Sequence, residues 1–270
     1  MNNPIFRVLR NPICSIKTVV LHLKHYPPDE AYYIRLVGSL RDDYTDAGLF
    51  ELRHPSPKEI NYCSPRFDNK WALAGKVIGG TWDQRQVAFE EASFCDGVSA
   101  SFYQSLKTHF ERGVGWEETP FVRQVLDQIE VGETTWTCAT RADVEEKCDR
   151  VDQLYERIAN RGYRTHEERI RAGVDDLKPT RRTALYRWLK THTVVGKDEI
   201  CVNIARDGTL LFFSGKHRLA IAKILGLDSI PVVVLTRHEQ WQEVRDRITA
   251  SKATDVPAGL RIHPDLQDIV

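Results

Sequence analysis

Residues 198–238 constrain the fold more than any other part of the chain. Apolar residues alternate over 200–204, and a second apolar run covers 210–213. An alternation with a period of two predicts a strand. The Asp207-Gly208 pair between the two runs predicts a hairpin turn. This stretch is therefore expected to begin with two antiparallel strands.

A helix and a third strand are expected after this hairpin. Gly215 permits a tight turn, and the amphipathic run that follows it predicts a helix ending at Gly226. Pro231 then leads into an apolar run over 232–235, which is typical of a buried strand. Strands and a helix in this order predict an α/β (α+β) fold with a small mixed sheet.

The start of this helix carries the candidate site. Lys216, His217 and Arg218 follow Gly215 directly. The first N–H groups of a helix lack partners within it, and the helix dipole favours an anion there. A phosphate is therefore the expected ligand. His217 is the candidate catalytic acid–base or a residue that fixes the turn, and Arg218 binds phosphate or pairs with a carboxylate such as Asp198.

The same stretch resembles the ParB/sulfiredoxin superfamily. The shared features are a strand, a glycine turn, an HR pair, a helix with alanine, a glycine and an IPV strand. In this chain they are Phe213, Gly215, His217-Arg218, Ala220, Gly226 and Ile230-Pro231-Val232. The resemblance is detailed over 198–238 and reaches back more loosely to Asp149. It implies a mixed sheet with a nucleotide or phosphate pocket formed by Gly215, Lys216, His217 and Arg218.

The superfamily contains several activities, and the local residues discriminate among them. Sulfiredoxins carry a catalytic cysteine just before the HR pair, where this chain has Lys216, so sulfiredoxin chemistry is not expected. Chromosome-partitioning members carry a GERR-type box that binds CTP, and here Lys216 and His217 replace its Glu and first Arg. Free-serine kinases have the HR pair and use a carboxylate base. The resemblance implies ATP, ADP or CTP with Mg²⁺ as ligand, and a phosphotransferase or nucleotide hydrolase as the enzymatic alternatives.

Arg237 and His238 are further candidates for binding phosphate. They follow the strand predicted over 232–235, and ligands of α/β folds gather beyond the carboxyl ends of strands. If the strands before Gly215 and before Arg237 are parallel neighbours, both groups line one crevice. The alternative is that His238 caps the last helix. Candidate carboxylates for a base or a metal are Asp83, Asp198 and Glu199.

A basic stretch suggests DNA as an alternative partner. Residues 83–149 hold fourteen acidic and six basic side chains, whereas 150–197 hold six acidic and twelve basic ones. The candidate nucleic-acid residues are Arg181, Arg182, Arg187 and Lys190, with Tyr186 and Trp188 between them. The same pattern fits an amphipathic helix with solvated arginines. A DNA-binding or nuclease-like ParB-domain protein is thus the second hypothesis, and a non-catalytic module with a vestigial pocket is the third.

Composition is that of an ordinary globular protein. The net charge is zero, and 41% of the residues are hydrophobic. No apolar run approaches the ~20 residues of a membrane span, so no membrane partner is expected. The six cysteines show no C-x-x-C pair, which argues against zinc and for a cytoplasmic setting.

The chain is expected to contain four segments. Residues 1–70 have an unclear fold, and 71–150 hold the first core strand and a mostly helical insertion. The ParB/sulfiredoxin-like core is expected over 151–250, and 251–270 form a loosely ordered tail. Within the insertion, helices are expected over 87–112, 120–131 and 140–161, because apolar residues recur there at three- and four-residue spacing.

Overall fold

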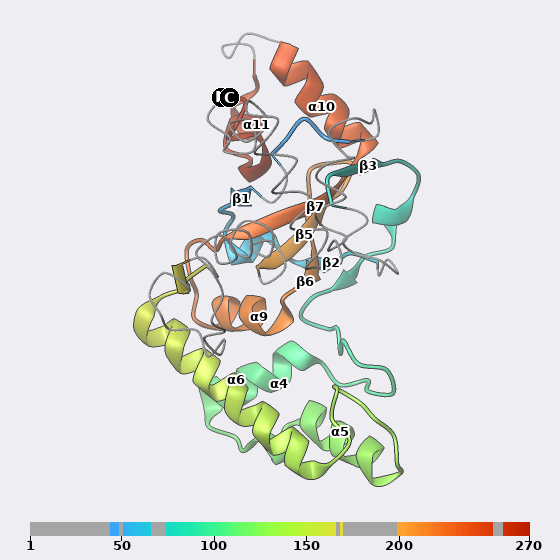
Figure 1. Cartoon of the computed structure of the whole chain (residues 1–270), viewed down its shortest axis with the longest axis vertical. Helices are drawn as coiled ribbons and strands as arrows, with labels where there is room; N and C mark the ends of the chain where they lie inside the picture. The colour runs from blue at the N-terminus through green and yellow to red at the C-terminus, as the bar shows by residue number, and fades with distance from the viewer. Residues whose placement is uncertain (1–43, 49–50, 66–73, 166–167, 170–198, 251–255) are drawn as a thin grey trace, which may run out of the picture.

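The chain folds around one mixed sheet. The structure, a computed structural model, describes residues 44–48, 51–65, 74–165, 168–169, 199–250 and 256–270. Within these ranges six α-helices accompany a seven-stranded sheet, which confirms the predicted α/β class. Figure 1 shows the sheet in the middle of an elongated molecule. Helices α10 (Glu239–Ala250) and α11 (Ala258–Arg261) lie toward one end of the molecule. Helix α9 (Lys216–Ile224) lies on the side of the sheet that faces the opposite end.

The direction of three central strands decides where the candidate residues lie. The strands are β1 (Leu52–Arg53), β2 (Tyr62–Cys63), β3 (Lys76–Ile78), β4 (Val87–Ala88), β5 (Ile200–Ile204), β6 (Leu210–Ser214) and β7 (Val232–His238). Their order is β1-β7-β5-β6-β2-β4, with β3 also paired to β7. Strand β5 is antiparallel to β6 and parallel to β7. Strands β6 and β7 therefore run in opposite directions, and their carboxyl ends lie at opposite ends of the sheet.

The predicted strand–turn–strand–helix unit is confirmed. Every residue of β5 is buried because both faces of the sheet are covered. The turn between β5 and β6 has Gly208 at φ +90°, and the Thr209 N–H donates to the Asp207 carboxylate. Helix α9 ends at Ile224, two residues before the predicted stop at Gly226, whose φ of +64° allows the Leu227 N–H to donate back to the Ala222 carbonyl.

Three helices form the insertion that covers α9. They are α4 (Phe102–Arg112), α5 (Pro120–Glu130) and α6 (Arg141–Arg161). Helix α6 begins with a capping box in which Thr140 and Asp143 each accept from the other's backbone N–H. All three pack with α9 and the sheet into one hydrophobic core. Figure 1 shows this helical group beyond α9, at the end of the molecule away from α10.

Several expectations outside the central unit are corrected. Residues 87–88 form strand β4, where a helix was expected, and residues 62–63 form strand β2 in the segment whose fold was unclear from the sequence. Two-residue strands carry no periodic signal, so only their partners reveal them. The tail is not loose over 256–270, because Asp265 and Leu266 are fully buried there. In the part of the chain described, no helix combines the length and apolar character needed to cross a membrane.

Candidate functional site

Gly215 sets the geometry at the start of α9. Its φ is +97°, and a Cβ at this position would lie 3.1 Å from the Cα of Ile200 on the neighbouring strand. Only glycine meets both conditions without strain. Among the described residues no side chain caps the first N–H groups of α9. This end of the helix is therefore a candidate anion site.

Two of the predicted cationic side chains have protein partners. The Lys216 ammonium lies 4.8 Å from the ring centre of Phe102 and 5.4 Å from that of Phe94. Arg218 Nη1 lies 3.4 Å from Oε2 of Glu199, whose side chain is fully buried. The carboxylate that pairs with Arg218 is thus Glu199, one of the three candidates from the sequence.

His217 is held between aromatic rings. Its ring centre lies 5.0 Å from that of Phe102, edge to face, and 6.1 Å from that of Trp136, nearly parallel. Burial lowers the pKa of His217 to about 3, and the neighbouring Lys216 charge acts in the same direction. The imidazole is therefore neutral near pH 7, which does not suit the predicted acid–base role. Its Nε2 is buried and has no hydrogen-bond partner among the described residues.

A pocket of about 400 Å³ opens between α6 and the start of α9. We call it the cationic pocket; it is lined by Lys147, Arg150, Val151, Leu154, Arg169, Gly215, His217 and Arg218. Four of these residues are Lys or Arg, and none is acidic. The pocket thus combines a positive wall with the uncapped helix start, and both features favour an anion.

Three strained backbone positions lie next to side chains at this pocket or at the start of α9. In the described ranges three residues other than glycine have positive φ, namely Phe94 at 61°, Trp136 at 52° and Thr137 at 60°. The rings of Phe94 and Trp136 contact the side chains at the start of α9. The Thr137 hydroxyl accepts from the Lys147 ammonium at 2.6 Å. Such conformations cost about 1–3 kcal/mol each and cluster at functional sites.

Arg237 and His238 do not belong to this pocket. Arg237 is buried and donates through Nε to Asp265 at 2.9 Å. The His238 Nδ1 accepts from the Gln240 N–H at 3.1 Å, and its Nε2 donates to the Gly80 carbonyl at 3.0 Å. His238 therefore caps α10, which was the alternative. The expected crevice does not form, because the carboxyl ends of β6 and β7 lie at opposite ends of the sheet.

Asp83 has a structural role at the same distant end. It accepts from Arg206 Nε at 2.9 Å and Nη2 at 2.7 Å, and it lies 3.8 Å from His238. These hydrogen bonds from Arg206 hold the pKa of Asp83 at about 2 despite its burial. Asp83 is therefore not a base for the cationic pocket.

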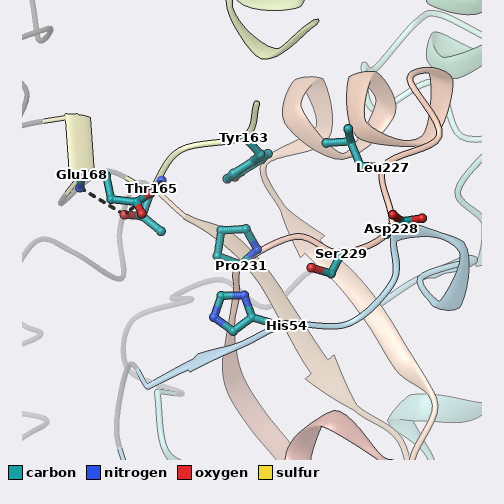
Figure 2. Close-up of a pocket in the computed structure, with 8 residues that line it drawn as sticks. All are labelled: His54, Tyr163, Thr165, Glu168, Leu227, Asp228, Ser229 and Pro231. Carbon is teal, nitrogen blue, oxygen red and sulfur yellow. Dashed lines mark hydrogen bonds between the residues drawn. The ribbon is translucent and has the colours of Figure 1, made fainter. Parts of the chain in front are cut away.

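A second pocket, of about 350 Å³, has the opposite charge (Figure 2). It is lined by His54, Tyr163, Thr165, Glu168, Leu227, Asp228, Ser229 and Pro231. Figure 2 shows Glu168 turned toward Thr165, whose N–H and hydroxyl lie 2.8 and 3.1 Å from the carboxylate. The described residues that line this pocket include two carboxylates and no Lys or Arg, which is the wrong charge for binding phosphate.

Some of the predicted residues lie outside the described ranges. These are Asp198 and the candidate DNA contacts Arg181, Arg182, Arg187 and Lys190. The nucleic-acid hypothesis therefore stays a prediction. Within the described ranges no cluster of three or more His, Cys, Asp or Glu is placed to hold a metal ion.

The wall that α6 contributes was not expected from the sequence. Lys147, Arg150, Val151 and Leu154 recur at three- and four-residue spacing and so share one helix face. That face was interpreted only as part of an apolar stripe, which runs from the acidic segment 83–149 into the basic segment 150–197. The sequence signal for Lys147 and Arg150 is that they are cations flanking the apolar stripe, and nothing local in the sequence indicates their closeness to α9.

Comparisons with known proteins add no family to this geometry. The ParB/sulfiredoxin resemblance over 198–238 therefore stays a prediction. No protein-family model matches the chain, and neither the curated proteins nor the solved structures contain a match.

Proposed function

We propose that this protein binds a phosphorylated ligand, specifically a nucleotide, in the cationic pocket. The observation that carries the proposal is the lining: among the described residues that line the pocket four are Lys or Arg and none is acidic, and the uncapped start of α9 belongs to the same lining. A volume of about 400 Å³ lies within the ~300–1,000 Å³ typical of small-molecule sites. The ligands that we propose to test are ATP, ADP and CTP, with and without Mg²⁺.

The first turn of α9, Arg218 and His217 each make a different contact with the bound phosphate. The N–H groups of the first turn of α9 donate to phosphate oxygens, as at other helix starts. Arg218 adds charge-assisted hydrogen bonds from the nitrogens that Glu199 does not occupy. The buried Nε2 of His217 gains a partner from the ligand or from a water that the ligand orders.

The lining of the cationic pocket supports binding of a phosphorylated ligand more directly than it supports catalysis. Neutralising phosphate charge is the main requirement of phosphoryl transfer, so a phosphotransferase or hydrolase is a consistent extension. Transfer also needs a base. His217, with a pKa of about 3, and Glu199, paired to Arg218, do not suit that role in the ligand-free chain. A base from the second substrate or from elsewhere in the chain would have to act.

Thermal unfolding with each nucleotide tests the proposal. A ligand present at one hundred times its Kd stabilises the folded state by about 2.7 kcal/mol. The native chain should therefore melt at a higher temperature with at least one nucleotide. Arg218→Lys keeps a positive charge beside Glu199 but loses the planar fork, and it should reduce this shift.

The control for charge alone is Arg157→Gln, because Arg157 is exposed on α6 and does not line the pocket. This variant should show the native shift. No shift of the native chain with any of the nucleotides at millimolar concentration would refute the proposal. Salt-sensitive retention of DNA by the same chain would then favour the alternative function.

A further inference from the structure

Helix α6 supplies two cations from outside the segment that carries the predicted phosphate motif. Lys147 and Arg150 are three residues apart and line the cationic pocket together with Val151 and Leu154. Residues at this spacing occupy one face of a helix. The pocket therefore has two walls with anion-binding character, one from α6 and one from the start of α9.

Lys147 is held in place by the strained turn. Its ammonium donates to the Trp136 carbonyl and to the Thr137 hydroxyl, and it lies 4.7 Å from the centre of the Trp136 ring. Burial lowers the pKa of Lys147 from its ordinary value. A nearby anion would favour the charged form, so the site gains most when Lys147 faces a negative group.

Arg150 is free to turn toward a ligand at small cost. Its partner is Glu146, one helical turn earlier, at 3.1 Å, and both side chains are more than half exposed. Exposed pairs of this spacing contribute about 0.3–0.5 kcal/mol. A ligand anion that meets Arg150 inside the pocket therefore competes with a weak interaction.

These observations extend the proposed phosphate site, on which the following inference rests. We infer that the ligand carries a second anionic group, and that Lys147 and Arg150 of α6 bind it while the start of α9 binds the first phosphate. The pocket volume of about 400 Å³ leaves room beyond one phosphate, and none of the described residues that line it is acidic. The second group is a phosphate or a carboxylate, since both accept bidentate contacts from arginine.

Calorimetric titration with small anions tests this inference. The probes are inorganic phosphate, which has no second anionic group, pyrophosphate, whose second group is a phosphate, and phosphonoacetate, whose second group is a carboxylate. The native chain should bind one of the two-group probes roughly tenfold more tightly than phosphate, the effect of one good charge-assisted contact. Arg150→Gln should remove most of this advantage, so that the ratio of the two-group affinity to the affinity for inorganic phosphate falls toward one.

Arg157→Gln is the matched control. Arg157 lies two turns further along α6, about 10 Å from Arg150, and is exposed outside the pocket. It should retain the native preference. Equal affinities for all three anions, or equal losses in the two variants, would overturn the inference while leaving the phosphate site intact. Binding of none of the anions to the native chain would overturn both proposals.

Discussion

One buried carboxylate ties the C-terminal segment to the sheet, and replacing it with the amide Asn should strongly destabilise the protein. Asp265 is fully buried and accepts from Arg237 Nε and from Trp241 Nε1, each at 2.9 Å. Arg245 and Arg53 lie 3.6 and 3.7 Å from its oxygens. Asp265→Asn keeps the shape and removes the charge that these three arginines share.

The expected magnitude follows from the burial of Arg237. Its side chain is 4% exposed, and within 4 Å the described residues offer it no acidic partner other than Asp265. Removing one partner of a buried ion pair costs about 3–5 kcal/mol, because the remaining charge stays buried. Arg245 retains Asp46 and Asp268, each at 3.0 Å, so it adds little to this cost. We therefore expect a loss of about 3–5 kcal/mol.

Urea unfolding of the native chain, Asp265→Asn and Asp268→Asn measures this difference. Asp268 is 20% exposed, and its partners Arg53 and Arg245 still have Asp265 nearby when Asp268 is replaced. Asp268→Asn should therefore lower the free energy of unfolding by only about 1 kcal/mol. Comparable m-values would show that the folded state is otherwise unchanged. Equal costs for both variants, or less than about 1 kcal/mol for Asp265→Asn, would refute the reasoning.

The pH dependence gives an independent check. Burial alone would raise the pKa of Asp265, but the charges of Arg237 and Arg245 outweigh it and lower the pKa below the ordinary value. A carboxylate of lowered pKa stabilises the fold fully above its unfolded pKa of about 3.9. This contribution is lost as the pH falls through the folded-state pKa. The difference between native chain and Asp265→Asn should therefore shrink in acid.

Three further outcomes are expected. Gly132 has φ +91° and lies in open space, so Gly132→Ala should lower the free energy of unfolding by about 1–2 kcal/mol. Gly215→Ala should lower it more, because the new Cβ would lie 3.1 Å from the backbone of a strand. Equal urea midpoints for the two variants would contradict this. Since burial lowers the pKa of His217 to about 3, its NMR ring signals should not titrate between about pH 5 and 8. Because Arg206 holds the pKa of Asp83 at about 2, Arg206→Gln should weaken the loss of stability between about pH 4 and 2, and an unchanged acid profile would argue against the pair.

The local parts of the fold were predictable because their signals are local. The alternation over 200–204, the Asp207-Gly208 pair and the glycines that bound α9 each act through neighbouring residues. Strand direction is different, because it depends on which distant segments pair. The expected crevice at Arg237 failed for this reason, since β7 pairs in parallel with β5 rather than with β6.

The candidate site shows the same division. The start of α9, with Gly215, is visible in the sequence as a glycine followed by cations and an amphipathic run. The opposite wall is not, because Lys147 approaches Gly215 only through the packing of α6 on α9. The burial of His217 was also hidden, since it depends on the Phe102 and Trp136 rings that tertiary packing brings to it.

The turn at residues 135–138, beside the pocket, places the Trp136 ring at the cost of a strained backbone. Thr135 and Cys138 exchange two backbone hydrogen bonds, of 3.1 and 2.8 Å, around Trp136 and Thr137. Tight turns with positive φ at both central residues normally contain Asn-Gly. Here a bulky aromatic residue occupies such a position, and its ring packs on His217. Glycine would relieve the strain but would remove that ring, so the strained turn is best explained by its contacts: the Trp136 ring packs on His217, and the turn holds the Lys147 ammonium, and both of these residues line the cationic pocket.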